Sequence, residues 1–172
     1  MPRNYLQYCI YSTIWSPNNE MLFASASGDY TVKIWDINEA HSVQTINAHQ
    51  YEILACDWNK YNEHILVSGS VDKTLKVWDL RSPEQEMMTL RGHTYAVRRV
   101  KFSPHQESVL ASCSYDMSFN LWDTEQEEAL VQQCEHHSEF VVGLDFNIFI
   151  EGQVASCAWD ESLCVWHVGQ QP

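Results

Sequence analysis

The sequence of 172 residues is poor in glycine, proline and positive charge. Only six glycines and five prolines stand beside 45% hydrophobic residues, which excludes a collagen-like or low-complexity chain and predicts a domain with a packed core. Ten basic side chains face 23 acidic ones, so the formal net charge is −13. Nucleic acids and anionic membranes are bound mainly through lysine and arginine. We therefore expect no nucleic-acid partner, and a basic peptide or protein surface instead.

Long apolar runs are missing as well. No stretch approaches the roughly 18 uninterrupted apolar residues that a membrane-spanning helix needs. Residues 1–5 also lack the apolar core of a secretory signal. We expect a soluble protein that is neither secreted nor inserted directly in a membrane.

Closely spaced cysteine pairs are absent among the six cysteines, which are Cys9, Cys56, Cys113, Cys134, Cys157 and Cys164. Several lie in apolar strand patterns, which indicates free buried thiols in a reducing compartment; a disulfide framework is the alternative. His136 and His137 near Cys134 resemble zinc ligands only superficially, because no second cysteine stands at ligand spacing. We predict no metal site and no cofactor.

The sequence does contain a repeat. An aspartate precedes a tryptophan by six residues four times, and successive tryptophans are 43, 44 and 44 residues apart: Asp29 and Trp35, Asp72 and Trp78, Asp116 and Trp122, Asp160 and Trp166. A histidine lies 29 residues before three of these tryptophans, at His49, His93 and His137. Four periods use nearly the whole chain. We predict a single repeat domain over residues 1–172, with repeats at approximately 6–48, 49–92, 93–136 and 137–168.

Each period is expected to hold four short strands. In the third, the apolar alternation predicts strands at 97–102, 109–114, 119–122 and 129–132, with Pro104 ending the first of them. Cys113 and its equivalents Ala26, Gly69 and Cys157 are all small, which indicates that one sheet packs flat against the next.

The period, with Gly92-His93 and the dipeptides Trp35-Asp36, Trp78-Asp79 and Trp122-Asp123, resembles the WD40 propeller repeat. The resemblance implies an all-β fold, a WD40 β-propeller of about four blades, each a four-stranded antiparallel sheet. A closed propeller of this family usually has about seven blades, so we expect a partial propeller.

A serine, a histidine and an aspartate in every period could be mistaken for a hydrolase triad. A catalytic set would occur once, and no GxSxG elbow holds any of the serines, so we predict no enzyme. In the WD40 family these residues form a buried hydrogen-bonded chain from the indole N–H through serine and histidine to aspartate. The resemblance thus implies a structural network comprising Asp29, Trp35, His49, Asp72, Trp78, His93, Asp116, Trp122, His137, Asp160 and Trp166.

The terminal repeats depart from the pattern. The first has Leu6 at the histidine position and little chain ahead of Cys9 to supply an outer strand, and the last has Trp166-His167 and Ala158. We expect exposed strand edges at both ends and self-association through them. A fragment, a shortened isoform, or one part of a larger ring would each account for these ends.

Seven segments are more specific than the WD40 consensus and resemble the family of receptors for the type-2 peroxisomal targeting signal. They run in order along the chain at Ile10–Pro17, Cys56–Glu63, Trp78–Arg81, Leu90–Pro104, Val109–Asp116, Glu135–Phe140 and Gly143–Phe146. The resemblance covers the C-terminal blades of such a receptor. It implies a cytosolic protein that shuttles to the peroxisome and delivers cargo enzymes with a co-receptor.

The signal is an amphipathic helix with a basic edge, so its groove should offer carboxylates and apolar rings. Positions at the top of the propeller lie two or three residues after each histidine, or just before each turn aspartate. The predicted cargo-binding residues are Tyr51, Glu52, Tyr95, Tyr115, Glu139, Phe140 and Trp159. The alternatives are a WD40 scaffold or adaptor in another complex, and a truncated form that no longer binds cargo.

Overall fold

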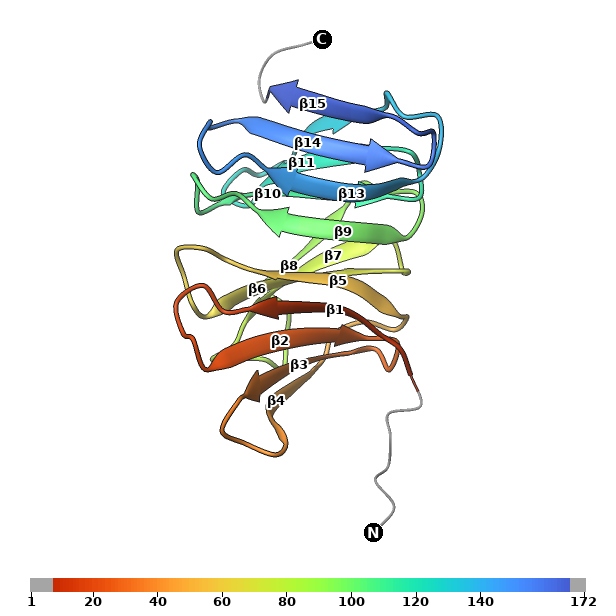
Figure 1. Cartoon of the computed structure of the whole chain (residues 1–172). Coiled ribbons are helices and arrows are strands. Elements are labelled where there is room, and N and C mark those ends of the chain that lie inside the picture. The colour runs from red at the N-terminus through yellow and green to blue at the C-terminus, as the bar shows by residue number, and fades with distance from the viewer. Residues whose placement is uncertain (1–7, 168–172) are drawn as a thin grey trace.

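The computed structural model describes residues 8–167, which form fifteen β-strands in four antiparallel sheets (Figure 1). We number the sheets as blades 1 to 4 along the chain. Blade 1 holds β1 (Ile10–Trp15), β2 (Leu22–Ser27), β3 (Thr31–Asp36) and β4 (Ser42–Asn47). Blade 2 holds β5 (Ile53–Trp58), β6 (Ile65–Ser70), β7 (Thr74–Asp79) and β8 (Met88–Arg91). Blade 3 holds β9 (Val97–Phe102), β10 (Val109–Ser114), β11 (Phe119–Asp123) and β12 (Leu130–Cys134). Blade 4 holds β13 (Val141–Phe146), β14 (Gln153–Ala158) and β15 (Leu163–His167).

The predicted all-β fold of a partial propeller is confirmed, and the four sheets do not close on one another. Each blade is a simple meander, because short turns join neighbouring antiparallel strands. The first strands of the blades, β1, β5, β9 and β13, lie next to one another in chain order and form the inner row (Figure 1). No helix among residues 8–167 is long and apolar enough to cross a bilayer.

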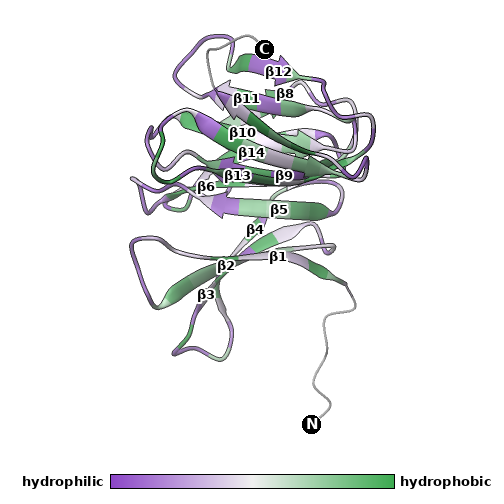
Figure 2. Cartoon of the chain, turned by 45° about the horizontal axis from the view of Figure 1, so that its top comes forward, coloured by the Kyte–Doolittle hydropathy of each residue, from purple (hydrophilic) through white to green (hydrophobic). Residues whose placement is uncertain are grey.

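Alternation along the strands buries both faces of each internal blade. Phe102, Leu110 and Trp122 lie on one side of blade 3 and pack on blade 2, while Ala111 and Leu121 lie on the other side and pack on blade 4. Three apolar clusters result, each shared by two neighbouring blades. In Figure 2 the strands carry green, hydrophobic segments next to purple ones, and most of the connecting loops are purple.

The turn between the second and third strand of every blade has the same construction. Its aspartate accepts hydrogen bonds from the backbone N–H and the hydroxyl of the residue two positions later; in blade 2, Asp72 accepts from Thr74 N–H at 2.9 Å and from Thr74 Oγ1 at 2.6 Å. The residue after each aspartate has a positive φ: 69° at Tyr30, 73° at Lys73, 67° at Met117 and 64° at Glu161. The aspartate bonds hold a left-handed residue at each turn without glycine.

Three expectations need correction. Blade 1 does have an outer strand, because β4 at Ser42–Asn47 pairs with β3. The outer strand of blade 3 runs over Leu130–Cys134 rather than 129–132. The cysteines are free, but Cys9 and Cys157 are exposed and Cys164 is half-buried, so only Cys56, Cys113 and Cys134 are buried thiols. Leu6 and residues 168–172 lie outside the described part of the chain.

Candidate peptide-binding surface

A chain of side-chain hydrogen bonds runs through blade 3 from its core to its turn. The indole Nε1 of Trp122 donates to Ser112 Oγ at 2.8 Å, and Ser112 Oγ lies 2.7 Å from His93 Nε2. The Nδ1 of His93 lies 2.8 Å from Asp116 Oδ2. The same three distances are 2.9, 2.8 and 2.7 Å in blade 2, which uses Trp78, Ser68, His49 and Asp72. These hydrogen bonds thus link the tryptophan of each of these two blades to the aspartate turn between its second and third strands.

Blade 4 carries the same chain. Trp166 donates to Ser156 at 2.8 Å, Ser156 lies 2.8 Å from His137 Nε2, and His137 Nδ1 lies 3.0 Å from Asp160. Ala158 occupies the position of Ser114, whose hydroxyl bonds the Tyr95 carbonyl, so its loss leaves the chain intact.

Blade 1 differs in its turn. Trp35 donates to Ser25 at 2.9 Å, and Asp29 bonds Lys33 Nζ at 3.2 Å. In the described part of the chain no histidine bonds Ser25 or Asp29.

These hydrogen bonds keep the turn aspartates ionised. Burial raises the pKa of Asp72, but hydrogen bonds from His49 and Thr74 outweigh that effect and lower the pKa to about 2. Burial likewise opposes ionisation of Asp116, and the bond from His93 holds its pKa well below the ordinary range. For Asp160, the bond from Ser162 comes first in lowering the pKa. Ser112 and Ser68 are fully buried and the histidines nearly so, so these side chains bond one another rather than solvent.

Backbone bonds fix the loops that carry the predicted cargo residues. The residue before each turn aspartate donates its N–H to the loop that leads into the inner strand: Val71 to Glu52 O at 2.9 Å, Tyr115 to Ala96 O at 3.1 Å, and Trp159 to Phe140 O at 3.1 Å. Both side chains of each pair are therefore held at the same end of the blade, which we call the top surface.

Three of the predicted aromatic residues form one cluster on the top surface. The ring centroids are 5.0 Å apart for Tyr115 and Phe140, 5.4 Å for Phe140 and Trp159, and 6.4 Å for Tyr115 and Trp159. Tyr115 comes from blade 3 and the other two from blade 4, so the cluster bridges two blades. Trp159 is 62% exposed, which leaves one large ring open to a partner.

The other predicted residues lie on the same surface without joining that cluster. Tyr51 and Tyr95 are exposed, and Lys73 Nζ stands 5.9 Å from the centre of the Tyr95 ring. Glu52 accepts a long hydrogen bond of 3.4 Å from the Tyr11 hydroxyl. Glu139 is exposed and, within residues 8–167, forms no side-chain hydrogen bond or ion pair. Both carboxylates can therefore meet a cation from solution.

Sequence reasoning missed Tyr8 on this surface. The bond from Gly28 N–H to Cys9 O, 2.8 Å long, is the blade 1 equivalent of the bonds described above. Tyr8 therefore stands where Tyr51, Tyr95 and Glu139 stand in the other blades, and its side chain is exposed. Leu6 stands at the histidine position of the first repeat, so counting two residues onward from it would have identified Tyr8.

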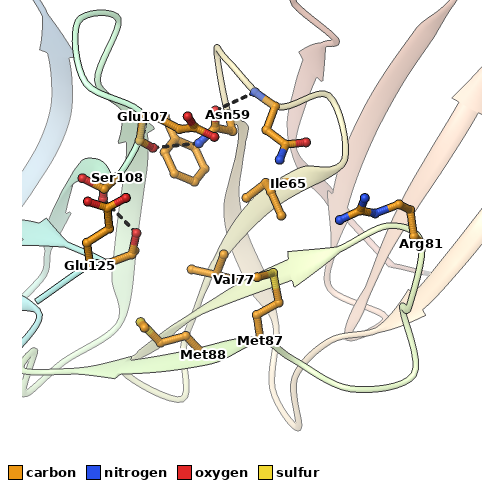
Figure 3. A pocket seen from close by; sticks show the side chains of 12 residues that line it. Asn59, Ile65, Val77, Arg81, Met87, Met88, Glu107, Ser108 and Glu125 are labelled. Carbon is orange, nitrogen blue, oxygen red and sulfur yellow. Dashed lines mark hydrogen bonds between the residues drawn. The ribbon is translucent and has the colours of Figure 1, made fainter. Parts of the chain in front are cut away.

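A cleft lies at the opposite end of the strands, between blades 2 and 3. This cleft of about 290 Å³ has an apolar floor of Ile65, Val77, Met88 and Phe102, with Arg81 and Glu125 at its sides (Figure 3). The Asn59 side chain donates to Glu107 O at 2.9 Å across the two blades and closes one end. None of the predicted cargo residues lines it.

His136 has a packing role. Its ring meets Trp166 edge-on with centroids 4.9 Å apart, and Cys134 is buried. Among residues 8–167, no three His, Cys, Asp or Glu side chains are arranged to hold a metal ion.

Four stacked meander sheets, tied by repeated Trp–Ser–His–Asp bonds and carrying clustered rings on one surface, define a partial β-propeller built for protein contacts. The family described as WD domain, G-beta repeat matches residues 6–36, 40–79 and 84–123, well over half of the chain, and the protein belongs to this WD40 repeat family. WD40 repeats form scaffolds for protein–protein interaction. The matched ranges end before blade 4, whose bonds nevertheless follow the same plan. No curated protein matches the sequence.

Proposed function

We propose that the protein is a receptor, or part of a receptor, for peroxisomal matrix protein import that binds the N-terminal type-2 targeting signal of cargo enzymes. The proposal starts from the seven segments that resemble the receptor named peroxin-7. Under this proposal the protein is cytosolic and moves to the peroxisome with a co-receptor. The more general reading, a scaffold for protein contacts, holds for the family as a whole.

The observation that carries this proposal is the aromatic cluster of Tyr115, Phe140 and Trp159 beside the free carboxylate of Glu139. An amphipathic helix binds through aliphatic side chains that fit against exposed rings. The basic residue that begins a type-2 signal would meet Glu139, which directly precedes Phe140 of the cluster. Charge on the acidic protein, −13 in total, would steer such a basic peptide toward it.

The test is fluorescence anisotropy of a labelled type-2 signal peptide titrated with the purified chain. A control peptide has its leading Arg and final His replaced by Glu. We expect saturable binding of the signal and none of the control. Absence of binding by a demonstrably folded chain would overturn the proposal and leave the family-level reading of a scaffold.

Variants locate the contact on the top surface. Trp159→Ala should weaken binding about tenfold, because a buried aromatic anchor commonly supplies more than 1 kcal/mol. Glu139→Lys should weaken binding of the signal peptide, but it should not weaken binding of a peptide whose leading Arg is replaced by Ala. Phe149→Ala is the matched control, because Phe149 is an exposed ring at the opposite end of blade 4. Equal losses from Trp159→Ala and Phe149→Ala would contradict this placement.

A further inference from the structure

The two outermost sheets each leave open a face that every internal sheet buries. In blade 1 this face carries Trp15, Phe23 and Trp35, whose rings contact one another, and we call it the β1 face. In blade 4 it carries Cys157, Leu163 and Val165, and we call it the β15 face. Blades 1 and 4 stand at the two ends of the row of sheets, and their strands fan out in opposite directions from the inner row (Figure 1).

The residues of the β1 face are open because no blade precedes them in the described structure. At the position of Trp15 the other blades have Trp58, Phe102 and Phe146, which are 1%, 3% and 8% exposed. Each of these three rings belongs to a cluster shared with the preceding blade. Trp15 is 56% exposed.

The β15 face shows the matching half of the same contact. Leu163 and Val165 are 69% and 56% exposed. Their equivalents in blades 1 to 3 are at most 5% exposed and pack on the following blade: Val32 and Ile34, Leu75 and Val77, Phe119 and Leu121. Cys157 likewise stands at the position of the buried Ala26, Gly69 and Cys113.

The two open faces are therefore complementary. Within the chain, the third strand of one blade packs on the inner-strand ring of the next blade three times: Ile34 with Trp58, Val77 with Phe102, and Leu121 with Phe146. Val165 and Trp15 are the unmatched members of the same series. Every copy of the chain carries one of each.

A polar contact supports the match. The buried carboxylate of Asp57 accepts the backbone N–H of Phe102 in the next blade at 2.7 Å. Asp145 has the same place in blade 4; its side chain is 76% exposed, accepts the backbone N–H of its own neighbour Phe146 at 3.1 Å and lies 4.0 Å from Lys101 Nζ. The equivalent donor in a following blade would be the N–H of Trp15.

We propose that the two faces bind a second copy of this chain head to tail, the β15 face of each copy covering the β1 face of the other. Large exposed apolar faces of this kind are uncommon on monomers. A pair of copies related by a two-fold axis covers all four faces, and a contact that did not close would continue into longer assemblies. A contact between two equal faces would leave the two faces of the other kind uncovered.

The first test is the mass of the wild-type chain by light scattering after size exclusion, across about a hundredfold range of concentration. We expect a dimer that dissociates on dilution. Hydrogen exchange at β1 and β15 of the wild type should slow as the dimer forms. This measurement tests the interface without any variant. A monomer throughout the range would overturn the proposal.

The second test separates head-to-tail pairing from pairing of equal faces. Trp15→Glu and Leu163→Glu should each be monomeric where the wild type is dimeric. Mixing the two variants should restore a dimer, because one keeps an intact β15 face and the other an intact β1 face. If one variant alone stays dimeric, or if the mixture stays monomeric, head-to-tail pairing is wrong. Phe149→Glu, which places the same charge on an exposed ring outside both faces, should dimerise as the wild type does.

Discussion

Buried serines decide how firmly each blade is tied together. Ser112 Oγ serves both the Trp122 indole and the His93 ring, at 2.8 and 2.7 Å, and is fully buried. Ser25 serves only Trp35 in the described structure, and that tryptophan is half-buried. Both serines therefore accept a hydrogen bond from a tryptophan, and within the described residues only Ser112 also bonds a histidine.

Replacing Ser112 should thus cost more than replacing Ser25. Ser112→Ala leaves two buried nitrogen atoms without a partner, and each such loss costs about 1 to 3 kcal/mol. We expect the free energy of unfolding to fall by about 1 to 3 kcal/mol more than in Ser25→Ala, measured by urea denaturation. Equal losses would show that the histidine bond contributes nothing to stability.

Ionised turn aspartates make the fold sensitive to acid. The pKa of Asp72 falls from an ordinary 3.8 to about 2 in the folded protein, because hydrogen bonds from His49 and Thr74 outweigh burial. The carboxylate therefore stabilises the fold above about pH 4, and this contribution is lost as the pH falls toward 2. The Tm difference between wild type and Asp72→Asn should be largest near neutral pH and should narrow below about pH 4. A difference that is constant over this range would contradict the assignment; Glu125→Gln, an exposed change, is the control.

At the residue scale, fixed spacing made the network predictable. The distance of 29 positions from His93 to Trp122, with Asp116 six before the tryptophan, locates three of the four members. The serine was harder to choose, because Ser112 and Ser114 alternate on one face and both are fully buried. Only the structure shows that Ser112 bonds the histidine while Ser114 bonds the Tyr95 carbonyl.

The contact between neighbouring sheets depends on small residues at one strand position. A Cβ on Gly69 of β6 would stand 2.7 Å from Val97 Cγ1 of β9, closer than real side chains approach. A Cβ on Gly28 would find its nearest neighbours at 3.4 Å, an ordinary contact. The two glycines therefore differ in what they tolerate.

Gly69→Ala should push blades 2 and 3 apart. Overpacking of this kind costs about 1 to 3 kcal/mol, whereas Gly28→Ala should have a small effect. The double variant Gly69→Ala, Val97→Ala should recover part of the loss, because it removes the methyl groups that clash. Thermal melting of the wild type, Gly69→Ala, Val97→Ala and the double variant measures this, and a loss in the double variant equal to the sum of the two single losses would argue against a direct contact.

At the element scale, the alternation of apolar residues predicted that strands are present. It did not predict to which blade each strand belongs. Ser42–Asn47 was not recognised as the outer strand of blade 1, because that strand was expected ahead of Cys9 rather than after Trp35. Exposure of the outer strand also blurs its bounds: Leu130–Cys134 alternates between exposed and half-buried residues before Cys134, and the prediction missed its start by one residue and its end by two.

For the whole molecule, the number of blades and their order followed from the repeat, but the state of the outermost faces did not. A sequence pattern assigns Cys157 and Cys113 the same small-residue position, and burial of either depends on a neighbouring blade. Cys113 has one, and burial raises the pKa of its thiol to about 12. Cys157 has none in the described structure and is exposed.

Thiol modification should therefore report the assembly of the whole molecule. Only a thiolate reacts with alkylating reagents at an appreciable rate, so the buried Cys113 should stay unmodified at any protein concentration. Cys157 should react quickly in dilute protein and slowly in concentrated protein, because a second copy would cover the β15 face. In Trp15→Glu the reaction should be fast at both concentrations. Peptide-level mass spectrometry after a brief pulse of reagent measures the two sites separately, and a Cys157 rate that ignores concentration in the wild type would mean that the face stays open.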